Sequence, residues 1–177
     1  LAKLDATDGS TIDYAFTRWK EVVDDLGDDY AVQERFFRQN YNAFRKLLNK
    51  PFIKEDRQYP LGTIATRSTL LDIYEKIVTK NPNGFLQMIT ENAKIYASII
   101  LNKEEGLTKE LRDGYEDLQR VQGAPSYLLL LYLVKNLNKL GLVESDIIKI
   151  CKLLTNFFVR RNITDTPPTR DLTNIFM

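Results

Sequence analysis

The sequence predicts an all-α protein, a single multi-helix bundle of about seven to eight helices. Apolar residues recur at helical spacing almost throughout the 177 residues, and no segment alternates strictly between polar and apolar residues as a half-buried strand would. The helical stretches are about 10 to 20 residues long and are joined mostly by short turns, which favours antiparallel packing of neighbours. We therefore expect one helical domain over residues 1–177, which buries roughly 70% of the surface of its unfolded chain.

The first two helices follow from apolar stripes and their end signals. Ser10 is a candidate N-cap for the first helix, and Gly27 closes it. Its stripe consists of Ile12, Ala15, Phe16, Trp19, Val22, Val23 and Leu26. The second predicted helix spans about Asp29 to Asn49. Its stripe consists of Phe37, Tyr41, Phe44 and Leu48, with Phe36 and Leu47 beside it.

Lys50 to Arg67 is the one long break in the helical pattern, and a connection of that length is unusual inside a compact domain. Its aromatic and basic residues are interleaved: Lys50, Phe52, Lys54, Arg57 and Tyr59. Such a segment could hold a nucleic-acid backbone. An apolar anchor that ties the segment to the protein body is the favoured interpretation.

The third and fourth helices lie on either side of a predicted turn, Asn81-Pro82-Asn83-Gly84. The third opens at Ser68 or Thr69, and its stripe consists of Leu70, Ile73, Tyr74 and Ile77. The stripe of the fourth consists of Phe85, Met88, Ile89, Tyr96, Ile99 and Ile100. Asn92 interrupts that stripe, as either a buried hydrogen-bonding residue or, the favoured interpretation, a satisfied or boundary residue that fixes packing.

Three further helices complete the pattern. The fifth begins near Thr108 and turns Leu111, Tyr115 and Leu118 inward. The sixth runs from Pro125 to Leu140 and is predicted to be central, because it is apolar nearly all round at its start. The seventh spans about Ser145 to Arg161, with Ile147, Ile150, Cys151, Leu154, Phe157 and Phe158 inward. The closing residues, Ile175 to Met177, would expose apolar surface, so we expect them to dock on the bundle.

Composition excludes several kinds of chemistry. With 25 basic and 24 acidic residues, the whole chain has no electrostatic signature for nucleic acid. From Val121 onward there is a small basic surplus, with seven basic and four acidic residues. Histidine, the usual neutral-pH base and metal ligand, is absent. Cys151 is the only cysteine, so no intrachain disulfide can form, and we expect a buried, inert thiol in a cytoplasmic protein. The longest apolar run, Tyr127 to Val134, is much shorter than the about 20 residues of a membrane span.

The densest acidic cluster combines Asp24-Asp25 with Asp28-Asp29. We interpret it as a solvated helix end followed by the cap of the next helix. The alternative, a divalent cation site, lacks the spacing of a calcium-binding loop. Glu104-Glu105 is interpreted as a loop charge cluster. We assign no catalytic, metal-binding or cofactor-binding residue, and expect neither a cofactor nor a membrane partner.

The paired arginines Arg160 and Arg161 close the seventh helix, where cations are favoured by the helix dipole. Adjacent helical residues point about 100° apart, so the pair cannot form one clamp. One arginine could face inward and bridge carboxylates or carbonyls while the other faces solvent. A structural role is favoured, and contact with a phosphate or with a neighbouring domain stays open.

The closing segment carries a resemblance to a known family. It reads Phe157-Phe158-Val159-Arg160-Arg161, then a Thr/Pro turn at Asp165 to Thr169, then Leu172-Thr173-Asn174-Ile175-Phe176. This pattern resembles the helical region of GmrSD-type, modification-dependent (type IV) restriction endonucleases. Upstream, the helices at Asn40–Leu48, Leu71–Val78 and Ala93–Leu101 are loosely similar to that region. The family-motif positions are Arg160, Arg161, Asn174 and Phe176.

The resemblance implies a bacterial anti-phage protein in which this region lies between a ParB/sulfiredoxin-like domain, linked to nucleotide binding, and an HNH nuclease domain. The hallmark Asp-Gly-x-Gln-Arg of the first is missing, and the second needs histidine, so neither catalytic set carries over. We therefore expect a non-catalytic part of a larger protein, whose partners are the other domains and whose role is to couple them. One alternative is a DNA-binding helical module in which Lys149, Lys152, Arg160, Arg161 and Arg170 form one basic face. Another is an unrelated helical protein-interaction domain.

Overall fold

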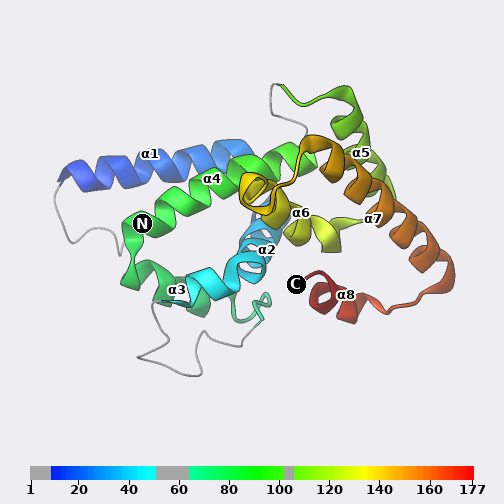
Figure 1. Ribbon diagram of the computed structural model, residues 1–177. Helices are drawn as coiled ribbons and strands as arrows, with labels where there is room; N and C mark the ends of the chain where they lie inside the picture. Colours follow the sequence, from blue (N-terminus) through cyan, green and yellow to red (C-terminus); the bar gives the residue numbers. More distant parts are fainter. Residues whose placement is uncertain (1–8, 51–63, 102–105) are drawn as a thin grey trace. The chain divides into compact units, whose positions relative to one another are not determined.

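The computed structural model describes residues 9–50, 64–101 and 106–177, with residues 9–12 described by their backbone only. Over these residues the chain forms eight α-helices and short 3₁₀ turns, without a strand (Figure 1). The prediction of an all-α, multi-helix fold is confirmed. The chain separates into two compact units, Leu1–Lys94 and Ile95–Met177, and the division falls inside one helix. The single domain expected over residues 1–177 stays a prediction.

The first unit contains α1 (Gly9–Leu26), α2 (Tyr30–Leu48), α3 (Leu70–Lys80) and the first part of α4 (Pro82–Leu101). α1 runs alongside this part of α4 (Figure 1), and the Thr90 hydroxyl donates a hydrogen bond to the Arg18 carbonyl over 3.4 Å.

The ends of α1 and the start of α2 test the capping predictions. α1 ends at Gly27 as predicted, with a left-handed φ of 75° and an N–H that donates to the Val23 carbonyl over 2.8 Å. Ser10 lies inside α1, so its assignment as the N-cap is wrong. Asp29 caps α2, because its carboxylate accepts the Ala31 N–H over 2.8 Å.

Aromatic rings from four helices meet in the core of the first unit. Phe37 stacks on Trp19 with ring centroids 5.8 Å apart, and Tyr74 meets both Phe37 (5.4 Å) and Phe85 (5.5 Å) edge to face. The buried apolar residues around them include Ala15, Val22, Leu26, Phe36, Tyr41, Ile73, Leu86 and Ile89.

One predicted stripe residue, Phe16, is exposed, contrary to prediction, and so is Leu47, which was placed beside the stripe of the second helix. Phe16 follows the buried Ala15, and Leu47 precedes the buried Leu48. A helix turns about 100° per residue, so the immediate neighbour of a buried position points well away from the core. The stripe predicted for the first helix was therefore one residue too wide.

The predicted turn at Asn81–Gly84 is instead the beginning of α4. The Asn81 side-chain oxygen accepts the Gly84 N–H over 3.1 Å, and Pro82 occupies the first helical position, where its missing N–H does no harm. Asn-Pro-Asn-Gly favours a turn in isolation, but the same residues also suit the first turn of a helix.

The second unit contains the end of α4 together with α5 (Lys109–Arg120), α6 (Tyr127–Lys135), α7 (Glu144–Thr164) and α8 (Thr169–Phe176). Its buried apolar residues include Tyr96, Ile99, Leu111, Tyr115, Leu118, Leu128, Leu130, Leu131, Ile147, Cys151, Leu154 and Phe158. The inward stripe predicted for the fifth helix is confirmed. None of the described helices is long and apolar enough to cross a membrane.

The sixth helix is shorter than predicted. α6 ends at Lys135, and a 3₁₀ turn at Asn138–Leu140 takes its place before Gly141, whose φ is 65°. The Asn136 side chain donates to the Tyr132 carbonyl over 2.8 Å, a local bond by which asparagine competes with the helical pattern. Hydrophobicity alone did not reveal this end.

α5 and α7 pack closely at Gly114. A Cβ atom on Gly114 would lie 3.2 Å from the Cβ of Cys151, so the absence of a side chain permits the approach. Cys151 is fully buried there, and burial raises the pKa of its thiol to about 12. The prediction of a buried thiol is confirmed, and its raised pKa disfavours the reactive thiolate.

Candidate functional site

Arg161 joins the end of α7 to the beginning of α8. Its Nε donates to the Pro167 carbonyl (3.2 Å), and its Nη2 donates to Asp165 Oδ1 (3.2 Å) and to Thr169 Oγ1 (2.6 Å). Nη1 donates to Asn162 Oδ1 over 3.3 Å. The Arg161 side chain is only 15% exposed. The guanidinium N–H groups therefore form hydrogen bonds within and next to the turn between the two helices.

An aromatic cluster holds α8 against α7 next to this joint. The Phe176 ring stacks on Phe158 with centroids 5.7 Å apart and meets Phe157 edge to face at 5.6 Å. Phe176 and Leu172 are buried. The expected docking of the closing segment is confirmed for Phe176, while Ile175 and Met177 stay exposed.

The other predicted contact residues face solvent. The Arg160 side chain is exposed and forms no ion pair with the described residues, and Asn174 is exposed as well. Arg170 is exposed and lies 3.7 Å from Asp171, too far for a strong hydrogen bond. Of the arrangements left open for the pair, the structure has one arginine inward and one outward, with Arg161 inward.

The five cations that the DNA-binding alternative needs on one exposed face do not all converge. Lys149, Lys152 and Arg160 follow one exposed side of α7, because they are spaced three and eight residues apart. Lys149 Nζ is paired with Asp146 Oδ1 over 3.1 Å. The hydrogen bond from the Val143 N–H and, to a smaller extent, the contact with Lys149 lower the pKa of Asp146. Arg161 points into the joint instead of joining this face.

A hollow of about 410 Å³ lies between α5 and α7. It is lined by Glu110, Asp113, Gly114, Asp117, Ile148, Lys152, Thr155 and Asn156. Three carboxylates from α5 thus face one lysine from α7. The Thr155 hydroxyl oxygen is buried without a hydrogen-bond partner among the described residues.

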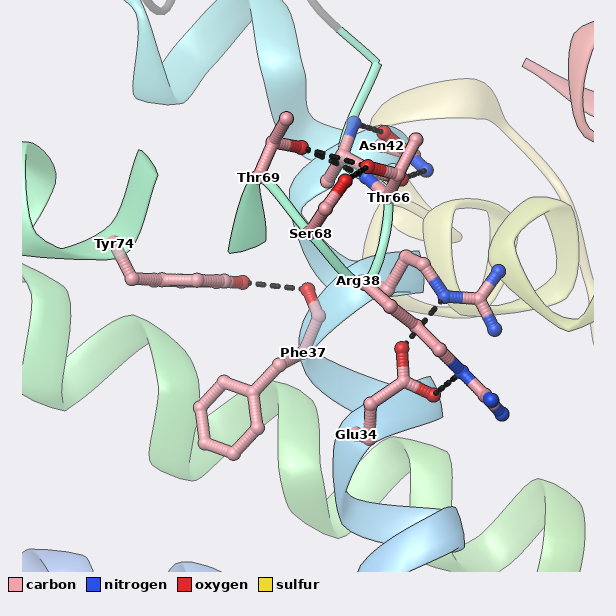
Figure 2. Close-up of polar contacts among 10 residues, drawn as sticks. Glu34, Phe37, Arg38, Asn42, Thr66, Ser68, Thr69 and Tyr74 are labelled. Atoms are coloured by element: carbon pink, nitrogen blue, oxygen red, sulfur yellow. Dashed lines mark hydrogen bonds and ion pairs between the residues drawn. The ribbon is translucent and has the colours of Figure 1, made fainter. Parts of the chain in front are cut away.

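In the first unit, the segment before α3 is tied to α2 by polar contacts that the sequence analysis did not identify (Figure 2). Asn42 accepts the Ala65 N–H over 2.9 Å and donates to the Ala65 carbonyl over 3.3 Å. Glu34 bonds Arg38 at 2.9 Å and Arg67 at 3.4 Å. The Glu34–Arg38 spacing of four was a visible signal; the partners of Asn42 and Arg67 are distant in sequence.

Asn92 belongs to a buried chain of hydrogen bonds in the same unit. Its Nδ2 donates to Asn40 Oδ1 (2.7 Å), Asn40 Nδ2 donates to the Tyr74 hydroxyl (3.1 Å), and that hydroxyl donates to the Phe37 carbonyl (2.7 Å; Figure 2). Burial raises the pKa of Tyr74. Asn92 is therefore buried and hydrogen-bonded and does not lie at a boundary, although its Oδ1 has no partner among the described residues.

The remaining candidates carry no assembled site. Across the described ranges, no three His, Cys, Asp or Glu side chains lie close enough together to hold a metal ion. Phe52, Lys54, Arg57 and Tyr59, and the pair Glu104-Glu105, lie outside the described residues.

Comparison with models of known families, with curated proteins and with solved structures gives no significant match. Any assignment of function therefore depends on the residues themselves and on the motif resemblance.

Proposed function

We propose that this chain is the non-catalytic helical region of a GmrSD-like, modification-dependent restriction protein of bacteria. In this role it couples a nucleotide- or DNA-sensing domain to an HNH nuclease domain. Its partners are these neighbouring domains of the same cytoplasmic protein, and it holds no cofactor of its own.

The observation that carries the proposal is that residues of the arginine motif form their contacts within the chain. Arg161 is largely buried, and its donors go to Pro167, Asp165 and Thr169 within the chain. Phe176, another motif position, packs on Phe158. A motif used in this way fits a structural joint better than a ligand site, and a rigid joint is what transmission between two attached domains requires.

The sequence supports the absence of catalysis from this region. It has no histidine for an HNH nuclease centre, and Asp113-Gly114 is followed by Tyr115-Glu116 instead of the x-Gln-Arg of the nucleotide-linked domain. In the resembled architecture, both reactions belong to the flanking domains.

Two experiments test the proposal. The purified chain, incubated with Mg²⁺, nucleoside triphosphates and modified or plain DNA, should show no turnover above background; turnover would contradict it. Sequencing of the parent gene should show an upstream Asp-Gly-x-Gln-Arg motif and a downstream HNH pattern. A gene with neither would leave the terminal motif as a chance match, and the chain as an unrelated helical interaction domain.

A DNA-binding module is the second candidate, favoured only by the shared exposed face of Lys149, Lys152 and Arg160. Binding through such a face should weaken steeply with salt, with a slope of log K against log salt near −0.9 for each phosphate neutralised. A flat salt response, or equal binding by a Lys152→Glu/Arg160→Glu variant, would exclude this candidate.

A further inference from the structure

A second hollow lies within the first unit, lined by the ends of α2 and α3 and by the beginning of α4. Its volume is about 560 Å³. The described residues that line it fall within 47–50, 77–81 and 84–88, and we call it the α3 hollow. Sites for small molecules commonly enclose about 300–1,000 Å³ and are mostly apolar with a few polar groups. The α3 hollow is therefore of a suitable size for a small ligand.

The lining of the α3 hollow is largely apolar. Leu48, Ile77 and Phe85 are buried residues of the lining. Leu47 also lines the hollow and is 60% exposed, and Met88 is half-buried there. The methionine side chain is flexible and adapts to the shape of what it contacts. A bound molecule could thus remove apolar surface of the protein from water.

The charged residues of this lining are both lysines. Lys50 follows α2 and Lys80 closes α3, and no Asp or Glu is among the described residues that line the hollow. The C-terminal end of each of these helices carries about half a negative charge, so the two full lysine charges outweigh both ends. The α5–α7 hollow differs in this respect, because three carboxylates there face Lys152.

We propose that the α3 hollow binds the anion of a long-chain fatty acid. The alkyl chain contacts Leu47, Phe85 and Met88. The carboxylate faces Lys50 and Lys80, whose charge is complementary to its own. Inorganic phosphate fits less well, because it would leave the apolar lining in water. The inference goes beyond the proposed restriction function and does not depend on it.

The two methionines of the chain allow a measurement at the site itself. Met88 lines the α3 hollow, whereas Met177 ends the chain in the second unit. The purified chain, labelled with ¹³C at the methionine methyl groups, is titrated with dodecanoate below its micellar concentration and followed by NMR. The Met88 signal should shift in a saturable way while the Met177 signal stays in place. A Met88→Leu variant assigns the two signals.

Two control ligands separate the contribution of charge from that of the alkyl chain. Dodecyltrimethylammonium has the same chain length with a cationic head group, and it should bind at least about tenfold more weakly than dodecanoate. Octanoate is shorter by four methylenes and should also bind at least about tenfold more weakly, because each buried methylene contributes roughly 0.8 kcal/mol.

Charge reversal on the protein gives a reciprocal check. Lys50→Glu/Lys80→Glu should weaken dodecanoate at least about tenfold and strengthen dodecyltrimethylammonium. Lys46→Glu/Lys76→Glu is the matched control, because these exposed lysines precede the first pair by four positions and do not line the hollow. It should weaken dodecanoate less than about threefold at 0.1 M salt, where exposed charges are screened over about 10 Å.

An apolar pair of variants tests the contact with the alkyl chain. Leu47→Ser should weaken dodecanoate about fivefold. Leu71→Ser should leave the affinity unchanged, since Leu71 is an 82% exposed leucine of α3 outside the lining. Circular dichroism verifies that each variant is folded.

Several results would overturn the inference. These are no shift of the Met88 signal, equal shifts of both methionine signals, equal affinity for the anionic and cationic ligands, and an equal loss in Lys46→Glu/Lys76→Glu. A dimer that Leu47→Ser dissociates, without dodecanoate binding, would identify a second copy as the occupant. Dodecanoate binding that appears only in a Phe52→Ser variant would identify the chain's own segment 51–63 as the occupant. The titration concerns the α3 hollow alone, whereas the parent gene sequence concerns the proposed family alone, so the two can fail separately.

Discussion

Arg161 Nη2 donates to Thr169 Oγ1 over 2.6 Å and so connects the last turn of α7 to the first residue of α8. Thr169 follows Arg161 by eight positions in the chain, and the Thr/Pro turn lies between them. Through this contact the motif residue Arg161 contributes to the fold.

Replacement of Arg161 by alanine should destabilise the protein. Arg161→Ala removes bonds to Pro167, Asp165 and Thr169, and a loss of about 1–3 kcal/mol in the free energy of unfolding is expected. Arg160→Ala, at the exposed neighbour, should change it by less than about 0.5 kcal/mol. Urea denaturation of both variants measures the difference, and equal effects would contradict the assigned roles.

Phe176 should matter more than its neighbour Ile175. Phe176→Ala leaves a cavity against Phe157 and Phe158 and should reduce stability by about 3 kcal/mol. Ile175 is half exposed, so Ile175→Ala should have an effect below about 0.5 kcal/mol. Thermal unfolding of the two variants checks this order, which would be reversed if the closing residues docked through Ile175.

Removal of the buried Tyr74 hydroxyl should lower the free energy of unfolding by about 1–2 kcal/mol. Tyr74→Phe leaves the Phe37 carbonyl without its donor and Asn40 Nδ2 without its acceptor. Tyr30→Phe is the control, because Tyr30 is exposed. A stability measurement that shows no difference between the two variants would argue against the buried hydrogen-bond chain.

Burial of the Cys151 thiol should make the free energy of unfolding depend on pH in the alkaline range. Its folded pKa of about 12 lies above the ordinary value of 9.0, so the folded state keeps a proton that the unfolded state loses between these values. The contribution is fully present below about pH 9 and is lost as the pH rises toward 12. The stability difference between the wild type and Cys151→Ala, measured by urea denaturation, should fall across this window. A constant difference would mean that the thiol is not buried in solution.

The sequence predicted the helices well because burial follows their periodicity. Ile73 and Ile77 of α3 are buried as their spacing requires. The errors arose where side chains act locally: Asn81 starts α4 by capping it, and Asn136 ends α6 by bonding Tyr132. Such bonds depend on backbone geometry, which hydrophobic spacing does not encode.

The site was predictable only in part. The 100° turn per residue indicated that Arg160 and Arg161 diverge, but not which one faces inward. Inward placement of Arg161 depends on acceptors at Pro167 and Thr169, whose positions follow from the turn after α7. Asn42 and Ala65 are 23 positions apart in the chain, and no local sequence pattern predicts their contact.

The most direct test of the structural joint is hydrogen–deuterium exchange of the α8 amides in Arg161→Ala and Arg160→Ala, read by mass spectrometry. The account predicts that Arg161→Ala speeds exchange in residues 169–176 roughly tenfold or more, since a loss of 1.4 kcal/mol corresponds to a factor of ten, while Arg160→Ala leaves it unchanged. Unchanged protection of α8 in Arg161→Ala would contradict it and would return Arg161 to the list of candidate ligand contacts.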